Sequence, residues 1–413
     1  VVLLTCHHGQ ATMERTLYTA NKYLEVEGQL EIPAEYPELV AVLSCHGYLS
    51  EINGQISGNK LFLSGTVETH LVYRGQAQLD QIPEYGLIQS GTDGAVFNGE
   101  INLPDLDGDW DWQARLVKIK VQPNTSRMLK YQLELEVKLR AREVYAVNYI
   151  DEIEAEAKVN TEVEYLLIEE PVLQTYVNRE INNHFPLTYP KPPLARLLSC
   201  QVCPVNSGAI FTKDRVNIEG KLEVHLVYVT LGEDGQEVGV EAQKWTEENG
   251  GAIPFQITVE TPMLEDPSVH YELWVEEVQF TSTHPESCRI QAKLGASIGL
   301  TKTRQVKAII DVTPDGEGLV DLKREAGTWV EVMEETERQI TVEKTLAIPA
   351  NQRKIRDILQ LTVAQPKIEW QLTHDQLLVT GEAFGTLLYQ GESLEEEGDA
   401  VTSASWGLGG TEA

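Results

Sequence analysis

The chain has 413 residues, with 33 Lys and Arg against 64 Asp and Glu, so its formal net charge is −31. A charge of this sign repels phosphate backbones and anionic membranes, so nucleic acid is not expected as a partner. The length suits roughly two to four domains. No apolar run reaches the roughly 20 residues of a membrane-spanning helix, so no membrane insertion is expected.

A nine-residue motif occurs three times along the chain. GTVETHLVY begins at Gly65, GKLEVHLVY begins at Gly220, and a weaker copy, GEAFGTLLY, begins at Gly381. Apolar residues alternate with polar ones from Leu61 to Tyr73, which is the period of a half-buried strand. The central glycine falls on the inward face, where a missing side chain indicates a bulge, a bend or close approach of another backbone.

A second shared feature lies upstream of each motif. Leu43, Leu198 and Leu359 precede the three glycines by the same distance, and apolar residues stand one and four positions before each leucine. In the first copy these are Val42 and Leu39. The i, i+3, i+4 spacing predicts a short helix, and the prolines ahead of it suit a helix start.

The segments between the motifs also read as strands. Residues 129–141 alternate strictly between apolar and polar, and residues 290–300 do the same after the second motif. Shorter strands are predicted before each, at 116–121 and 271–280. The predicted fold class is therefore all-β, with tandem β-sandwich-like modules, short helices and an incomplete third module.

Three modules follow from a repeat of about 155 to 160 residues between successive motif glycines. The first is predicted over 1–155, the second over 156–325 and the third over 326–413. After the third motif the sequence has only an acidic, glycine-rich stretch. The third module is therefore predicted to lack the second half of the fold.

Several short segments recur together around the motifs. They are YLEVEGQLEIP at 23–33, PELVAVL at 37–43, LFLSG at 61–65 and LVY at 71–73; PPLARLL at 192–198 and VNIEG at 216–220; and IP at 348–349 with LLVTG at 377–381. This combination resembles the SPOCS domain, which is named for spore-coat morphogenetic proteins of endospore-forming bacteria. The resemblance implies a structural protein of a spore envelope or an extracellular surface. Family members of the coat-morphogenetic type end in a LysM module, which this sequence does not show.

Four carboxylates at alternate positions suggest a calcium site. Asp105, Asp107, Asp109 and Asp111 have the spacing of the oxygen ligands in a calcium loop. The stretch departs from the EF-hand, because its sixth position is tryptophan and its twelfth is leucine. The alternatives are calcium binding and a solvated acidic loop, and no other cofactor is expected.

The five cysteines leave the redox compartment open. Cys200 and Cys203 have the C-x-x-C spacing used by zinc and redox sites, but a second pair is lacking. Cys45 occupies the same repeat position as Cys200, and both are interpreted as core thiols. A disulfide within or between chains involving Cys200 or Cys203 is the alternative. Cys6 is the candidate for an intermolecular disulfide.

The remaining polar residues indicate no catalytic site. The sequence has no phosphate-binding loop, nucleophile elbow, paired zinc-binding histidines or dinucleotide fingerprint, so no enzyme is expected. His70 and His225 occupy equal places in the motif, each two residues after a glutamate, Glu68 or Glu223. They are interpreted as structural partners on the outward face of the strand.

Two functions fit these features. The first is a non-enzymatic structural protein that self-assembles into a filament or lattice, because half a module leaves an open edge or face for another chain. Residues 1–4 are the candidate donor strand, and other spore-envelope proteins are possible partners. The second is a monomeric adaptor that recruits coat proteins, or recognises a cell-wall glycan near Trp110 and Trp112. The acidic charge predicts assembly contacts that are apolar or cation-bridged and that strengthen with salt or calcium.

Overall fold

Every regular element in the described residues is a β-strand, which confirms the predicted all-β class. The computed structural model describes residues 4–76, 85–89, 94–156, 158–187, 191–265, 267–315, 343, 345, 347–348, 350, 353–363, 367–374, 376–394 and 398–412. Within these ranges no helix is long and apolar enough to cross a membrane.

The first repeat is a sandwich of two sheets. Its strands are β1 (Leu4–Glu31), β2 (Leu39–Ser57), β3 (Lys60–Gly75), β4 (Tyr85–Gln89), β5 (Ala95–Asn102), β6 (Asp109–Pro123) and β7 (Met128–Ala155). Sheet A has the order β1-β7-β6, and in sheet B β3 pairs with β2, β4 and β5. Apolar side chains of β3, β5 and β7 fill the space between the sheets, so the strict alternation of β7 reflects one buried face.

The second repeat has the same topology. Its strands are β8 (Val159–Pro186), β9 (Leu194–Thr212), β10 (Arg215–Leu231), β11 (Glu237–Trp245), β12 (Ile253–Glu260), β13 (Ser268–His284) and β14 (Ser287–Pro314). Sheet C, of order β13-β14-β8, corresponds to sheet A. Sheet D, in which β10 pairs with β9, β11 and β12, corresponds to sheet B. The inner faces of sheets C and D bury one continuous apolar core.

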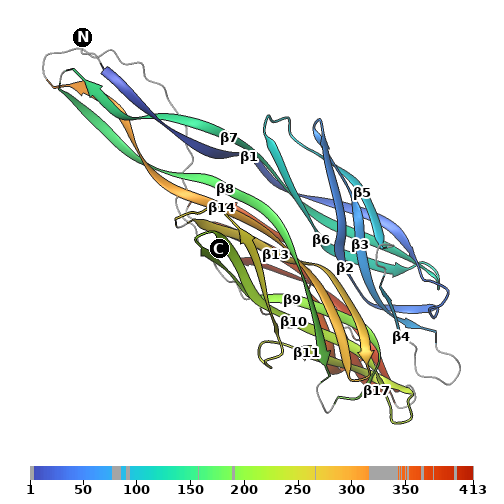
Figure 1. Ribbon diagram of the computed structural model, residues 1–413. Coiled ribbons are helices and arrows are strands. Elements are labelled where there is room, and N and C mark those ends of the chain that lie inside the picture. The colour runs from blue at the N-terminus through green and yellow to red at the C-terminus, as the bar shows by residue number, and fades with distance from the viewer. Residues whose placement is uncertain are drawn as a thin grey trace.

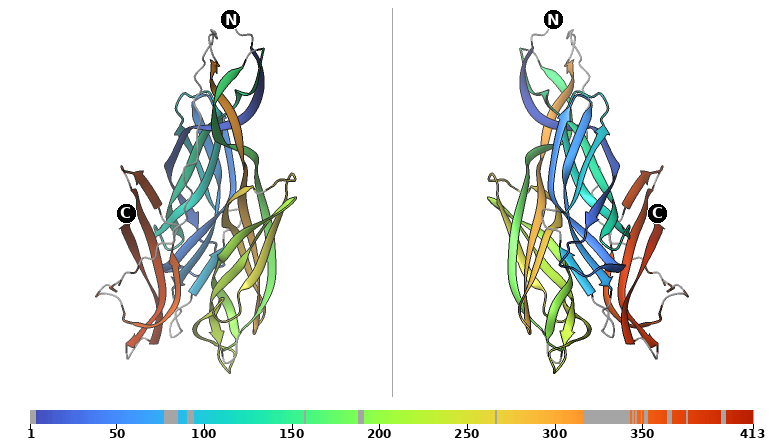
Figure 2. Two further views of the ribbon diagram at one scale, coloured as in Figure 1. Left: turned by 90° about the vertical axis from the view of Figure 1, so that its left-hand side faces the viewer. Right: turned by 90° about the vertical axis from the view of Figure 1, so that its right-hand side faces the viewer.

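The third repeat contributes a single sheet to the described structure. Sheet E contains β15 (Ile355–Val363), β16 (Lys367–Leu372), β17 (Leu377–Leu394) and β18 (Gly398–Glu412). The central β17 pairs with β15 and β16 along one side and with β18 along the other. Much of the stretch expected to be an acidic tail is therefore strand β18. Figure 2 shows sheet E, in red, as the outer layer on one side of the molecule.

The predicted short helices are wrong, because these residues begin the edge strands β2, β9 and β15. Near its start each strand carries a pair of β-bulges three residues apart, and Leu43, Leu198 and Leu359 are the extra residues of the second bulge of each pair. A bulge lengthens the spacing of inward side chains from two residues to three. In the first repeat the inward residues are Leu39 and Val42, and the bulge residue Leu43 that follows is buried on the outer face of the sheet. The buried residues therefore have the i, i+3, i+4 spacing of a helix although the chain is extended.

The bulge leucines join the three repeats. Leu43 of sheet B, Leu198 of sheet D and Leu359 of sheet E are buried in one apolar cluster, which we call the junction. Val72, Val227 and Leu388, each seven residues after the motif glycine, complete its centre. Ser199 donates a hydrogen bond to Gln360 across it, 2.8 Å long. Sheets B, D and E thus pack together through their outer faces.

Two long two-stranded ribbons extend from the sandwiches toward the N-terminal end (Figure 1). They are the outer halves of β1 with β7 and of β8 with β14. Ala11, Met13, Ile168 and Val306 are buried between them. The Arg304 guanidinium also donates to the carbonyl of Gln10, at 3.2 Å. The two ribbons therefore pack together, and we call them the paired arm.

The motif glycine gives room to an aromatic ring. A Cβ at Gly65 would lie 2.6 Å from the Phe97 ring, and one at Gly220 would lie 2.7 Å from the Phe255 ring. Both phenylalanines are the cross-strand partners of these glycines. The predicted close approach of another backbone is also confirmed in these two repeats, since the added Cβ would lie 2.1 Å from the Glu51 carbonyl oxygen at Gly65 and 3.1 Å from the Ser207 Cα at Gly220. In sheet E the position of Gly381 is less crowded, with its nearest atom at 3.5 Å.

The junction predicts a large stability effect for one leucine. Leu198→Ala leaves a cavity among three sheets, so we expect the free energy of unfolding to fall by roughly 2–5 kcal/mol. Denaturant titration of the full chain measures it. Leu167→Ala, at a side chain 47% exposed on the arm, is the matched control and should change little. Equal costs for the two variants would contradict the junction.

Candidate assembly surface

The inner face of sheet E is open to solvent over most of its length. Strand pairing places residues of β15 and β16 on the same side of the sheet as Gly381 and Tyr389 of β17, which is the side that is buried in sheets B and D. Seven large aliphatic side chains there are 36–73% exposed, and we call them the open face. They are Ile355, Ile358, Leu361, Val363, Ile368, Leu372 and Leu377.

The equivalent residues of the second repeat are buried, unlike those of the open face. Ile358 and Leu361 are 54% and 49% exposed, whereas their counterparts Leu197 and Cys200 are 8% and 0% exposed. The difference arises because sheet C covers sheet D, while no described residues form a comparable sheet over sheet E. One end is better protected, since Tyr389 is fully buried and Ile348 packs nearby. The open face therefore has the composition of a core surface, but none of the described sheets covers it.

The open face also differs from the rest of the surface in charge. The face-lining positions of β15, β16 and β17 carry no Asp, Glu, Lys or Arg, in a chain whose net charge is −31. Contiguous apolar patches of several hundred Å² are uncommon on monomeric proteins and mark interaction sites. The arrangement can bind an apolar surface and offers no group for catalysis.

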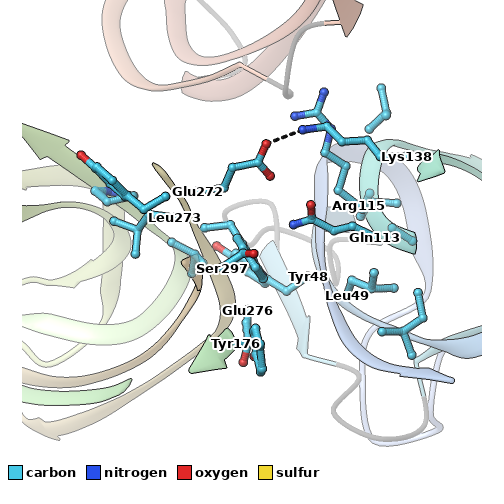
Figure 3. A pocket seen from close by; sticks show the side chains of 18 of the residues that line it. Tyr48, Leu49, Gln113, Arg115, Lys138, Tyr176, Glu272, Leu273, Glu276 and Ser297 are labelled. Carbon is cyan, nitrogen blue, oxygen red and sulfur yellow. Dashed lines mark hydrogen bonds and ion pairs between the residues drawn. The ribbon is translucent and has the colours of Figure 1, made fainter. Parts of the chain in front are cut away.

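A cleft of about 3340 Å³ separates the first two repeats. Its walls include the edge strands β2, β6 and β13 and the outer face of sheet C. Lys138 and Glu272 form an ion pair of 2.6 Å from opposite walls, drawn as the dashed line in Figure 3. On the sheet C wall, Tyr176 stacks on Trp274 and donates a hydrogen bond to Glu276. The cleft has a mixed polar and aromatic lining.

Two histidines lie together where the first repeat meets the second. His46 and His70 are cross-strand partners with ring centroids 5.3 Å apart, and Phe280 of β13 lies 5.6 Å from His70. His70 is fully buried and makes no hydrogen bond within the described ranges, with its Nε2 3.5 Å from a carboxylate oxygen of Glu68. The structural interpretation of His70 therefore holds on its geometry, with a partner on its own strand.

Burial sets the protonation of His46. It lowers the pKa of His46 to about 3, with a further lowering by His70, while a hydrogen bond to the Cys200 backbone acts in the opposite direction. The same surroundings raise the pKa of Tyr48 well above its usual value, chiefly through burial. The equivalent His225 is only half-buried. Position in the motif therefore does not decide the environment.

The four aspartates predicted to bind calcium do not converge. Asp105 and Asp107 lie exposed in the connection before β6, and Asp109 and Asp111 lie at its start. Asp111 pairs with Arg142 at 3.0 Å. In the described part of the chain no group of three or more His, Cys, Asp or Glu side chains is placed to hold a metal ion. The geometry gives the calcium prediction no support.

All five cysteines are free thiols in this structure. Cys200 and Cys203 lie three residues apart on a regular stretch of β9, so they point to opposite faces and form no disulfide with each other. Cys200 and Cys288 are buried in the core of the second repeat, as the core-thiol interpretation requires for Cys200. Cys6 lies partly exposed on the arm.

The predicted donor strand and the two tryptophans predicted to lie near a glycan make contacts within the chain. Leu4 pairs with Ala155 at the end of β1, and residues 1–3 lie outside the described residues. The candidate donor strand is thus partly used within its own chain. Trp112 packs closely on the backbone of Gly54, and Trp110 lies against Tyr18.

Comparison with family models, with curated proteins and with solved structures finds no match to this chain. The assignment of function therefore rests on the residues and geometry described above.

The His46 environment predicts acid sensitivity. The pKa of about 3 in the folded protein lies below the usual histidine value of 6.5, so the unfolded chain binds the proton more readily. Stability is full above pH 6.5 and falls as the pH drops toward 3, by up to about 1.4 kcal/mol per pH unit. His46→Gln, which introduces the residue of the equivalent position Gln201, should flatten this dependence in denaturant titrations between pH 6.5 and 5.

Exposed His284 provides the control, and His284→Gln should keep the wild-type slope. If His46→Gln and wild type lose stability in parallel over this range, His46 is not the acid-sensitive group. The His46 ring lines the cleft and keeps partial contact with water, so the loss of stability per pH unit should not exceed this value.

The thiols should differ in reactivity. Burial raises the pKa of Cys45 and of Cys288 to about 12, and that of Cys200 well above its usual value. Because the thiolate is the reactive form, Cys200 and Cys288, which lie buried in the core of the second repeat, should react with iodoacetamide only after unfolding, and Cys45, which is half-buried beside the cleft, should react slowly. Cys6 should react first in the native protein. Mass spectrometry after a short pulse identifies the sites, and rapid native labelling of Cys200 would contradict its buried position.

Proposed function

We propose that this protein is a non-enzymatic structural subunit that self-assembles through the open face of sheet E. The observation that carries the proposal is the set of seven aliphatic side chains exposed on a surface that is core in the other repeats. Sandwich sheets lose substantial hydrophobic stabilisation when one inner face stays in water. Association with a partner recovers that stabilisation, whereas catalysis has no use for such a surface.

The place of assembly is inferred from the resemblance to the SPOCS domain. That resemblance supports a spore envelope or another extracellular surface, in a filament or a lattice. The paired arm lies away from sheet E in Figure 2, so an assembled subunit would present the arm to a further contact. Other envelope proteins are then candidates for the partner at the arm.

A second candidate function is supported by the cleft. Its wall carries the Tyr176–Trp274 pair, and aromatic faces beside polar groups are suited to stacking on a sugar ring. A monomeric adaptor that binds a cell-wall glycan or recruits coat proteins would use this region. A titration of intrinsic fluorescence with cell-wall material tests it, and the absence of any shift would count against this alternative.

The assembly proposal predicts a specific loss of association. Leu361→Asp places a charge at the centre of the open face, and its side chain is already 49% exposed, so the fold should tolerate it. We expect wild-type protein to associate as its concentration rises and the variant to stay monomeric in sedimentation velocity. Salt should favour wild-type association by screening the net charge.

Ile210→Asp is the matched control, since Ile210 is 53% exposed on the outer face of sheet D. It should associate as wild type does. Association that is unchanged by Leu361→Asp would exclude the open face as the contact, and electron microscopy would show whether ordered particles still form.

A further inference from the structure

We infer that the partner of the open face is the same face of a second copy, so that two E sheets pack face to face about a two-fold axis. This inference rests on the proposed function and specifies its first contact. Two copies would then complete one sandwich between them, formed from two third repeats.

The first two repeats show what kind of surface closes such a face. Sheet A covers sheet B, and sheet C covers sheet D, each with an apolar inner face of antiparallel strands. The cover is therefore a sheet about 10 Å away whose side chains interdigitate with those beneath. An edge strand alone would not reach across the whole face. The partner must bring a sheet with an uncharged inner face.

Among the described sheets, only sheet E has such a face still available. The inner faces of sheets A, B, C and D are already buried against one another in pairs. A second copy therefore carries the one described surface that matches in both chemistry and form. The same patch then serves both subunits, as in the isologous contact of the commonest homodimers.

Charge favours this pairing over docking elsewhere on a second copy. Each copy has a net charge of −31, so most approaches bring like charges together. The face-lining positions of β15, β16 and β17 carry no charge, and the charged residues near this face, Glu412 of β18 opposite Val379 and Arg353 beside Gly391, lie at its two ends, so contact over its middle desolvates no ionised group of these three strands. This orientation avoids the desolvation penalty that a contact through the acidic surface would incur.

The area supports a dimer that forms at moderate concentration. Sheet E is three strands wide, with β15 and β16 end to end along one side of β17 and β18 along the other, and a face of this width about fourteen residues long covers roughly 600 Å², from the usual strand spacing and rise per residue. Stable specific interfaces bury about 800 Å² on each partner, so the contact is near the lower limit. The dimer should therefore be reversible and concentration-dependent. Larger particles would require a second contact.

The experiment combines photo-crosslinking with sedimentation, on the full chain. A photoreactive p-benzoylphenylalanine replaces Ile358, and this protein is mixed with an equal amount of ¹⁵N-labelled wild type before irradiation. We expect crosslinks between the two isotopic forms that map to residues 355–391 of the second copy, and sedimentation that shows a discrete dimer. The same photoreactive group at Ile210 is the control and should give no crosslink to sheet E.

The other outcomes separate the two proposals. Crosslinks to a different surface of the second copy, with growth beyond the dimer, would overturn the face-to-face pairing and leave assembly through the open face standing. Crosslinks only within one chain, with a monomer at every concentration, would overturn both.

Discussion

Three leucines that β-bulges extrude from edge strands bring the repeats of this chain into contact. Leu43, Leu198 and Leu359 point away from their own sandwich cores into a shared apolar junction. A regular strand buries one face, but a bulge adds a residue that serves a second face without disturbing the first. The edge strand can therefore belong to a sandwich and to the junction together. This double use sets where sheets B, D and E lie and leaves the inner face of sheet E turned outward.

The sequence allows the strands to be predicted better than their surroundings. Residues 129–141 keep a strict period of two because one face is buried along the whole segment, and β7 follows that pattern. The helix predicted at Leu39 to Leu43 is wrong, since bulges produce a helical spacing in an extended chain. The spacing of apolar residues indicates which side chains are buried, but not whether the backbone is a helix or a bulged strand. Only the register with the partner strand distinguishes the two conformations.

The candidate site was beyond prediction for a related reason. Leu361 alternates with polar neighbours as a core residue does, and nothing in that pattern says whether a second sheet covers it. The predicted incompleteness of the third repeat was the one signal that pointed toward an open edge or face. For the aspartates at 105–111 the pattern did not show that only Asp109 and Asp111 belong to a strand, where alternate residues share a face, while Asp105 and Asp107 lie in the connection before it. His70 and His225 show the same limit, since packing between repeats buries one and leaves the other half-exposed.

Charge and burial have opposite effects on the proposed association of so acidic a chain. Repulsion between copies acts over the whole surface but is screened within about 10 Å at moderate salt. Hydrophobic attraction acts only where apolar side chains meet, so the open face must outweigh the screened repulsion. A compact, uncharged contact of limited area then gives an association that responds to ionic strength. In the proposed dimer the acidic surface disfavours other orientations by repulsion, and every other described sheet already has its inner face covered.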